Sequence, residues 1–182
     1  MFTGHFAVAI AGAGTARRVP LGLLIVAAFG ADLLEGMIAV FKMADPTRIW
    51  SHSFPATVAT GLLLGLGWRL VGGSWREALV VLVVAASHSA LDYVTGFKTV
   101  WPGNGPVGLG WYSRPYVDAA IEGLLCVAAW LVWRASLARD RRMSLPAWAM
   151  LGVLLAASGA ALAHLLYGGL TAELDSLSKF VR

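Results

Sequence analysis

The chain has 182 residues, of which 58% are hydrophobic and only 13% are charged, and its mean hydropathy is +0.72. Soluble domains carry about 25% charged residues, so this composition excludes a soluble enzyme and predicts one integral membrane domain over residues 1–182. The net charge of +4 is small and spread along the chain, as is typical of membrane-flanking residues, so no nucleic-acid partner is expected.

The apolar segments predict an all-α polytopic membrane protein with five main hydrophobic helices and a short N-terminal helix. The N-terminal segment, residues 3–16, is too short for an ordinary span, because its fourteen residues would rise only about 21 Å as a helix. We expect it to form a helical hairpin with the start of the next segment, packed against the rest of the protein. The five main segments are each about the length that a bilayer core requires; they cover residues 20–41, 54–72, 77–97, 116–135 and 146–169.

If successive helices cross the membrane in alternating directions, the charged residues divide unequally between its two sides. The side that holds the Arg17-Arg18 turn and the loops 69–76 and 134–145 collects eight arginines and two acids. The other side, which holds the Gly-, Pro- and Trp-rich loop 98–115, collects six bases and eight acids. Because Lys and Arg favour the cytoplasmic side, the arginine-rich side is expected to face the cytoplasm. The predicted location is the bacterial inner membrane, with membrane lipids as partners.

His88 and Asp92 are four residues apart in the segment 77–97, so in a helix both side chains lie on one face. An Asp at the middle of a bilayer costs about 2.5–3.5 kcal/mol on insertion scales. A bound metal ion would offset this cost. A buried His–Asp hydrogen bond that holds helices together would offset it equally well.

The same alternating arrangement of helices places further polar side chains at the membrane depth of His88 and Asp92. All four histidines fall in one membrane leaflet, together with carboxylates from three segments: His5, Asp32, Glu35, His52, His88, Asp92, Asp118, Glu122 and His164. Asp118 begins its segment, where a carboxylate favours the positive end of the helix dipole, whereas Glu122 lies one turn deeper. A shared depth predicts a polar cavity that opens on the exterior or periplasmic side.

Imidazole nitrogens and carboxylate oxygens without a thiolate suit a divalent metal, with Zn²⁺ expected and Mn²⁺ or Fe²⁺ as alternatives. There are enough candidate ligands for one or two ions, and such an ion lowers the pKa of its bound water toward about 7. The candidate ligands are His5, Asp32, His52, His88 and Asp92. Glu35 is expected to be a ligand or a general base, and Arg48 and Arg114 are expected to hold a substrate anion.

The order of these motifs resembles the family of membrane-bound metal-dependent hydrolases, also described as LexA-binding, inner-membrane-associated hydrolases. His88-Ser-Ala-Leu-Asp-Tyr-Val-Thr95 matches that family's His-x-x-Leu-Asp-x-x-Thr motif in full. His5 corresponds to an early histidine of the family. Thr47-Arg-Ile-Trp-Ser-His-Ser53 matches a His-Arg-Gly-x-Thr-His-Ser motif except at its first, third and fifth positions. The motifs cover residues 1–115 of the chain, and the C-terminal helices, residues 116–169, lie outside them.

The resemblance implies hydrolysis of a phosphoester or related ester, on a small molecule or a lipid at the membrane surface. The His-x-x-x-Asp element is also similar to that of zinc-dependent phospholipase C enzymes, which points to the same chemistry by analogy. Two departures from the family concern predicted metal ligands. The family's Pro-Asp-x-Asp motif reads Ala31-Asp-Leu-Leu-Glu35 here, so the proline is absent and the second acid, Glu35, is displaced by one residue. Thr47 stands where the family has a histidine.

Two other classes of function fit the same residues. In a transporter or channel, intramembrane carboxylates and histidines relay protons or bind a cation, and they are spread through the membrane thickness. In a scaffold, the same groups only hold helices together. The sequence does not indicate the substrate or the oligomeric state.

Overall fold

The computed structural model describes residues 2–41, 51–137, 146, 148–160, 162–163 and 167, and the regular elements in these ranges are helices. In chain order they are α1 (Phe2–Thr15), α2 (Leu21–Ala28), α3 (Gly30–Val40), α4 (Phe54–Leu70), α5 (Trp75–Thr95), the 3₁₀ helix η2 (Trp111–Ser113) and α6 (Pro115–Ser136). A further helix, Trp148–Ala160, follows α6. The prediction of an all-α fold is confirmed in the described part of the chain.

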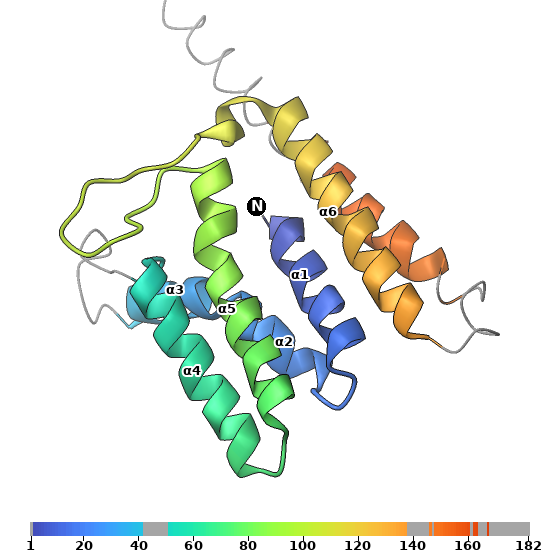
Figure 1. Cartoon of the computed structure of the whole chain (residues 1–182). Helices are drawn as coiled ribbons and strands as arrows, with labels where there is room; N and C mark the ends of the chain where they lie inside the picture. Colours follow the sequence, from blue (N-terminus) through green and yellow to red (C-terminus); the bar gives the residue numbers. More distant parts are fainter. Residues whose placement is uncertain are drawn as a thin grey trace, which may run out of the picture.

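The short helix α1 lies inside the bundle, between α5 and α6, with α2 beside it (Figure 1). Its small side chains allow this position: Ala7 and Ala9 are almost fully buried and belong to two apolar cores, one shared with α6 and the other with α2 and α5. The expected hairpin with the Arg17-Arg18 turn is present, and its first helix is covered by protein, as a helix too short to span must be.

Helices α4 and α5 form a close antiparallel pair, and two glycines of α4 make the approach possible. A Cβ atom on Gly61 would lie 2.9 Å from the Cα of Leu82, and one on Gly65 would lie 2.7 Å from the carbonyl oxygen of Ala78. The spacing is the small-xxx-small pattern of packed membrane helices. The start of α5 is fixed by a capping box between Ser74 and Glu77.

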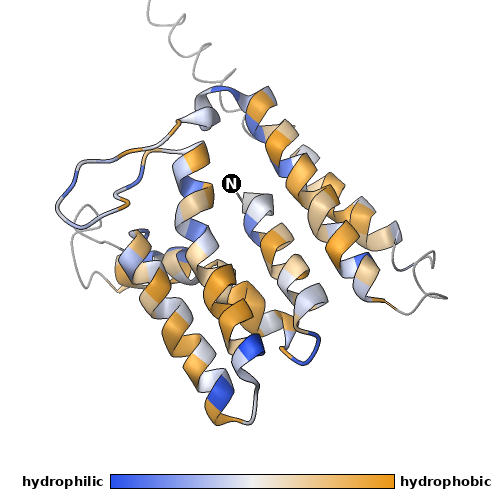
Figure 2. Cartoon of the chain, viewed as in Figure 1, coloured by the Kyte–Doolittle hydropathy of each residue, from blue (hydrophilic) through white to orange (hydrophobic). Residues whose placement is uncertain are grey.

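The prediction of five spans is borne out only in part. Among the described residues, two helices, α5 and α6, are long and apolar enough to cross a membrane, and the number rises to three if α2 and α3 count as one bent span. The segment 20–41, expected as one helix, bends by 67° where α2 ends and α3 begins. Helix α4 has 17 residues, and the described part of 146–169 includes only the apolar helix Trp148–Ala160. Apolar residues occur along most of the length of the longer helices (Figure 2), and many of the large ones are exposed.

Backbone hydrogen bonds connect the two ends of the loop 98–115 and join it to α4. Lys98 and Val107 pair through two backbone hydrogen bonds of 3.1 and 2.9 Å. The backbone N–H of Phe54 donates to the carbonyl of Val100 at 2.8 Å and so joins the loop to the start of α4. This contact places the residues that precede α4 beside the C-terminal end of α5.

Candidate metal centre

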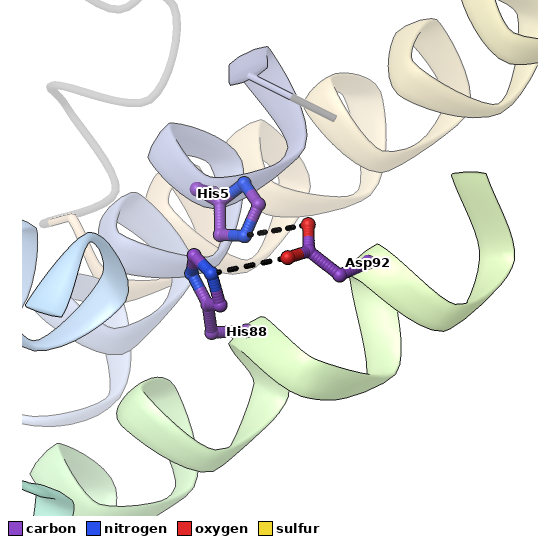
Figure 3. Close-up of side chains that lie close together, drawn as sticks. All are labelled: His5, His88 and Asp92. Carbon is purple, nitrogen blue, oxygen red and sulfur yellow. Dashed lines mark ion pairs between the residues drawn. The ribbon is translucent and has the colours of Figure 1, made fainter. Parts of the chain in front are cut away.

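Three buried side chains from α1 and α5 converge near the middle of the bundle (Figure 3). His5 of α1 and His88 and Asp92 of α5 are exposed by only 3%, 1% and 7%. The two carboxylate oxygens of Asp92 face the two imidazoles: Oδ1 lies 3.9 Å from Nε2 of His5, and Oδ2 lies 3.3 Å from Nε2 of His88. The four-residue spacing of His88 and Asp92 therefore puts both on one face, as predicted.

A second group shares His88 and extends the cluster toward solvent. Asp32, in the first turn of α3, places Oδ1 3.0 Å from Nε2 of His52 and 3.9 Å from Nε2 of His88. His52, directly before α4, lies 3.6 Å from Oδ2 of Asp92, so the two groups are continuous. The side chain of Asp32 is 48% exposed, whereas that of His52 is 7% exposed. The cluster is thus buried at His5 and His88 and exposed at Asp32.

The orientation of His88 is set by the end of α2. Nδ1 of His88 lies 2.8 Å from the carbonyl oxygen of Ala28, the last residue of α2, and can only donate to it. The final carbonyls of a helix have no partner within that helix, so the break after Ala28 supplies this acceptor. With the proton on Nδ1, the lone pair of Nε2 points toward Asp92 and Asp32. That Nε2 atom is buried, and no hydrogen bond satisfies it within the described residues.

His52 is held by contacts on both sides of its ring and on its backbone. Nδ1 lies 3.0 Å from Oε2 of Glu35 and 3.1 Å from Oγ of Ser51. The hydroxyl of Ser89 donates to the backbone carbonyl of His52 at 2.9 Å, and Thr57 lies within hydrogen-bond distance of the same hydroxyl. These contacts fix the segment before α4 against α5, so Nε2 of His52 points toward the carboxylates.

The separations between Asp92 and the three imidazoles are longer than ordinary hydrogen bonds, whereas His52 and Asp32 lie 3.0 Å apart, within hydrogen-bond distance. Hydrogen bonds between nitrogen and oxygen span about 2.7–3.2 Å. Two atoms bound about 2.1 Å from one tetrahedral zinc ion lie about 3.4 Å apart. The three distances from Asp92 to the imidazoles are 3.3, 3.6 and 3.9 Å. All three exceed the hydrogen-bond range and lie near or above the separation of two zinc ligands. The group His5, His88 and Asp92 can therefore hold a metal ion, and its donor set does not define which metal.

The structure brings together all five predicted ligands: His5, Asp32, His52, His88 and Asp92. Glu35 contacts the far side of the His52 ring and is not a member of either three-residue group. Arg114 is exposed at the start of α6, and its side chain contacts none of these ligands in the described part of the chain. Arg48 and His164 lie outside the described residues.

The sequence indicated less about the groups that surround the ligands. The carbonyl of Ala28 carries no sequence signal, because every residue has one. Ser89 directly follows His88, and Thr57 lies one turn into α4, but neither position differs in pattern from an ordinary small polar residue of a packed helix.

Asp118 and Glu122 form a separate buried pair on α6, exposed by 3% and 2%. Glu122 accepts a hydrogen bond from the hydroxyl of Thr3, on the α6-facing side of α1, and Oδ1 of Asp118 has no hydrogen-bond partner among the described residues. The pair does not join the histidine cluster.

No protein-family model, curated protein or solved structure matches the chain. The resemblance to membrane-bound hydrolases therefore remains a prediction from the motifs, and the metal centre is supported by its own geometry.

Proposed function

We propose that the chain is a membrane-embedded, metal-dependent hydrolase of phosphoesters or related esters. The observation that supports this proposal is the convergence of three imidazole Nε2 atoms on the Asp92 carboxylate at separations typical of metal ligands. If the three imidazoles are neutral and carry no proton on Nε2, their lone pairs would face the oxygens of two carboxylates in a largely buried site. A divalent cation removes that repulsion.

In this proposal His5, His88 and Asp92 hold the metal, and zinc suits their nitrogen and oxygen donors, with manganese or iron as alternatives. Asp32 and His52 lie on the open side of the cluster, where they bind a second ion or complete the first. A metal ion in such a site supplies Lewis-acid polarisation of an ester and lowers the pKa of a nearby water. The half-exposed Asp32 marks the side from which a substrate and water would enter.

The surrounding residues take supporting roles in the proposal. Ala28 and Glu35 fix the two histidine rings from their Nδ1 atoms, an arrangement that orients histidine ligands in metal sites. Arg48 is proposed to bind the substrate anion. Arg114 is a weaker candidate for that role, because its exposed side chain does not contact the cluster. The substrate is a small molecule or a lipid, and the proposed site faces the periplasm from the inner membrane.

The metal content of the purified protein tests the proposal. We expect stoichiometric metal in the wild type and its loss in Asp92→Asn, which keeps the size of the side chain and removes the charged ligand. Asp118→Asn is a matched control, because Asp118 is also a buried carboxylate of a candidate span and lies outside the cluster. Elemental analysis of the three proteins measures the content.

Activity is then measured on chromogenic phosphomonoesters and phosphodiesters. We expect the wild type and Asp118→Asn to hydrolyse at least one of these substrates and Asp92→Asn to hydrolyse none. A wild-type protein without bound metal would contradict the metal centre. A metal-loaded protein that hydrolyses no ester would contradict the hydrolase assignment alone.

One observation favours a structural role instead. His52 lies 3.0 Å from both Asp32 and Glu35, which are ordinary lengths for charge-assisted hydrogen bonds. In a purely structural ion-pair cluster, Asp92→Asn would lower stability while the metal content of the wild type would already be negligible. The same elemental analysis therefore separates the two functions.

A further inference from the structure

A pocket of about 350 Å³ lies at the end of the bundle where α1 finishes and α5 begins. Arg17 and Arg18 of the α1–α2 turn line it, together with Ser74, Arg76 and Glu77 from the start of α5. Figure 2 shows strongly hydrophilic residues on this turn and on the facing ends of α4 and α5. The pocket thus has three guanidinium groups and one carboxylate.

The carboxylate accepts two hydrogen bonds and attracts Arg18, but none of the three guanidiniums lies within ion-pair distance of a carboxylate among the described residues. Oε2 of Glu77 accepts hydrogen bonds from the backbone of Ser74 at 2.8 Å and from the indole of Trp68 at 3.3 Å. Within the described residues, none of the three arginines of the pocket forms an ion pair. Three like charges around one pocket repel one another, and a bound anion would relieve that repulsion.

The backbone that carries these arginines is fixed in place. Ala16 and Val19, on either side of Arg17 and Arg18, are exposed by only 4% and 3%, and the N–H of Val19 donates to the carbonyl of Ala16 at 3.0 Å. Gly14 packs so closely on α6 that a Cβ atom would lie 2.8 Å from the Cα of Trp133. The capping box fixes the first turn of α5, which carries Arg76. A rigid frame lowers the entropic cost of binding a ligand between the three side chains.

The position of the pocket selects the kind of anion. Trp75, which begins the candidate span α5, is 66% exposed, and tryptophans at the ends of spans lie at the level of the lipid headgroups. Guanidinium groups bind phosphate through paired hydrogen bonds, and basic pockets between membrane helices bind anionic headgroups. We propose that Arg17, Arg18 and Arg76 form a binding site for the phosphate of an anionic lipid headgroup.

This lipid site is separate from the candidate metal centre. Arg76 and His88 are twelve residues apart on α5, which corresponds to about 18 Å along a helix. The proposal does not depend on metal binding or on hydrolysis. The proposal also differs from a role in membrane orientation alone, in which arginines favour the cytoplasmic side without binding a particular lipid.

Native mass spectrometry of the full-length protein in neutral detergent tests the proposal, with phosphatidylglycerol and phosphatidylcholine as competing probes. We expect phosphatidylglycerol to bind preferentially and Arg76→Gln to weaken its binding about fivefold. Arg69→Gln is the matched control, because Arg69 lies at the same end of the bundle, in the last turn of α4, and does not line the pocket. Its guanidinium lies over the ring of Trp75, 5.5 Å from the ring centroid. The triple variant Arg17→Gln, Arg18→Gln, Arg76→Gln is expected to lose the preference.

Equal weakening by Arg69→Gln would overturn the proposal, since the effect would then follow the total charge. Equal binding of the two lipids by the wild type would overturn it as well. A third arm adds inorganic phosphate alone. Competition by millimolar phosphate against phosphatidylglycerol would support a site for the phosphate group, whereas binding of inorganic phosphate without binding of phosphatidylglycerol would overturn the lipid assignment. Circular dichroism confirms that each variant is folded.

Discussion

A buried histidine needs a partner for each ring nitrogen, and His88 shows how this fold supplies one and leaves the other for a ligand. The carbonyl of Ala28 occupies the Nδ1 side at 2.8 Å. The Nε2 side faces the carboxylate of Asp92 at 3.3 Å without a satisfied hydrogen bond in the described residues. His52 is oriented in the same manner, with Glu35 on its Nδ1 side. An imidazole ring that is already oriented by a hydrogen bond at Nδ1 can bind a ligand through Nε2 with little further loss of side-chain entropy.

The position of Glu35 predicts how its removal would act. Glu35→Ala should weaken metal binding about 10- to 100-fold, because the ring of His52 would lose the carboxylate that orients it, while the protein should still bind metal at saturation. Glu35→Gln should have a smaller effect, since the amide oxygen still accepts from Nδ1. Titration of the metal-free protein with zinc against a competing chelator measures the affinities.

A complete loss of metal in both Glu35 variants would contradict the positioning role. It would instead make Glu35 a ligand, as the sequence alone also allowed. Asp118→Asn serves again as the control, because it changes a buried carboxylate that does not contact a histidine of the cluster.

The candidate ligands were predictable because their chemistry is marked in the sequence. His88 and Asp92 lie one helical turn apart, and helical geometry requires them to share a face. His5 and His52 reach the same place only because two other segments fold against α5, and the assumption of alternating helices was sufficient to predict that convergence. The backbone acceptor of Ala28 was not predictable, because it depends on where α2 ends. Arg114 was predicted to hold a substrate anion, and the structure places it in an exposed position at the start of α6.

At the level of helices, the close pair α4–α5 positions three candidate ligands: His88 and Asp92 lie on α5, and His52 lies directly before α4. The break between α2 and α3 matters as much. It sets Asp32 and Glu35 beside His52, and it frees the carbonyl of Ala28. A Cβ atom on Gly30 would lie 3.0 Å from Cγ2 of Thr60, so α3 also approaches α4 closely. The run 20–41 did not predict this bend: Asp32 and Glu35 interrupt its hydropathy, but the contact that accompanies the bend comes from another helix.

Packing of α4 on α5 leads to a stability prediction. Gly65→Ala should lower the free energy of unfolding by about 1–3 kcal/mol, because the added methyl group would press on the backbone of α5. Gly67→Ala is the control on the same helix. No atom outside the helix lies within 4 Å of its Cβ position, so the better helix propensity of alanine should raise stability by about 0.5–1 kcal/mol.

Both glycine variants are compared with the wild type by equilibrium unfolding in mixed micelles. Equal effects of the two substitutions would contradict the close packing of α4 on α5. A selective loss in Gly65→Ala should also reduce metal affinity, since α4 and α5 together position three of the candidate ligands.

For the whole molecule, the two ends of the bundle have different chemistry. The arginine pocket lies where α1 ends and α5 begins, and the His/Asp cluster lies toward the start of α1 and the end of α5. A protein with such polarity has a defined orientation in a membrane, because arginines favour the cytoplasmic side. In the predicted orientation the α4–α5 turn lies in the cytoplasm, and the loop 98–115 lies on the periplasmic side with the open face of the cluster.

Cysteine labelling tests this orientation, because Cys126 is the only native cysteine and is buried, so Cys126→Ser gives a background without accessible thiols. Val71, in the α4–α5 turn, and Asn104, in the loop 98–115, are both exposed. A membrane-impermeant maleimide should label Asn104→Cys in intact cells and Val71→Cys only after the membrane is permeabilised. Labelling of both variants in detergent shows that both thiols react. The reverse pattern would place the cluster on the cytoplasmic side and the arginine pocket outside, in conflict with the charge distribution, and would direct the search for a substrate to the cytoplasm.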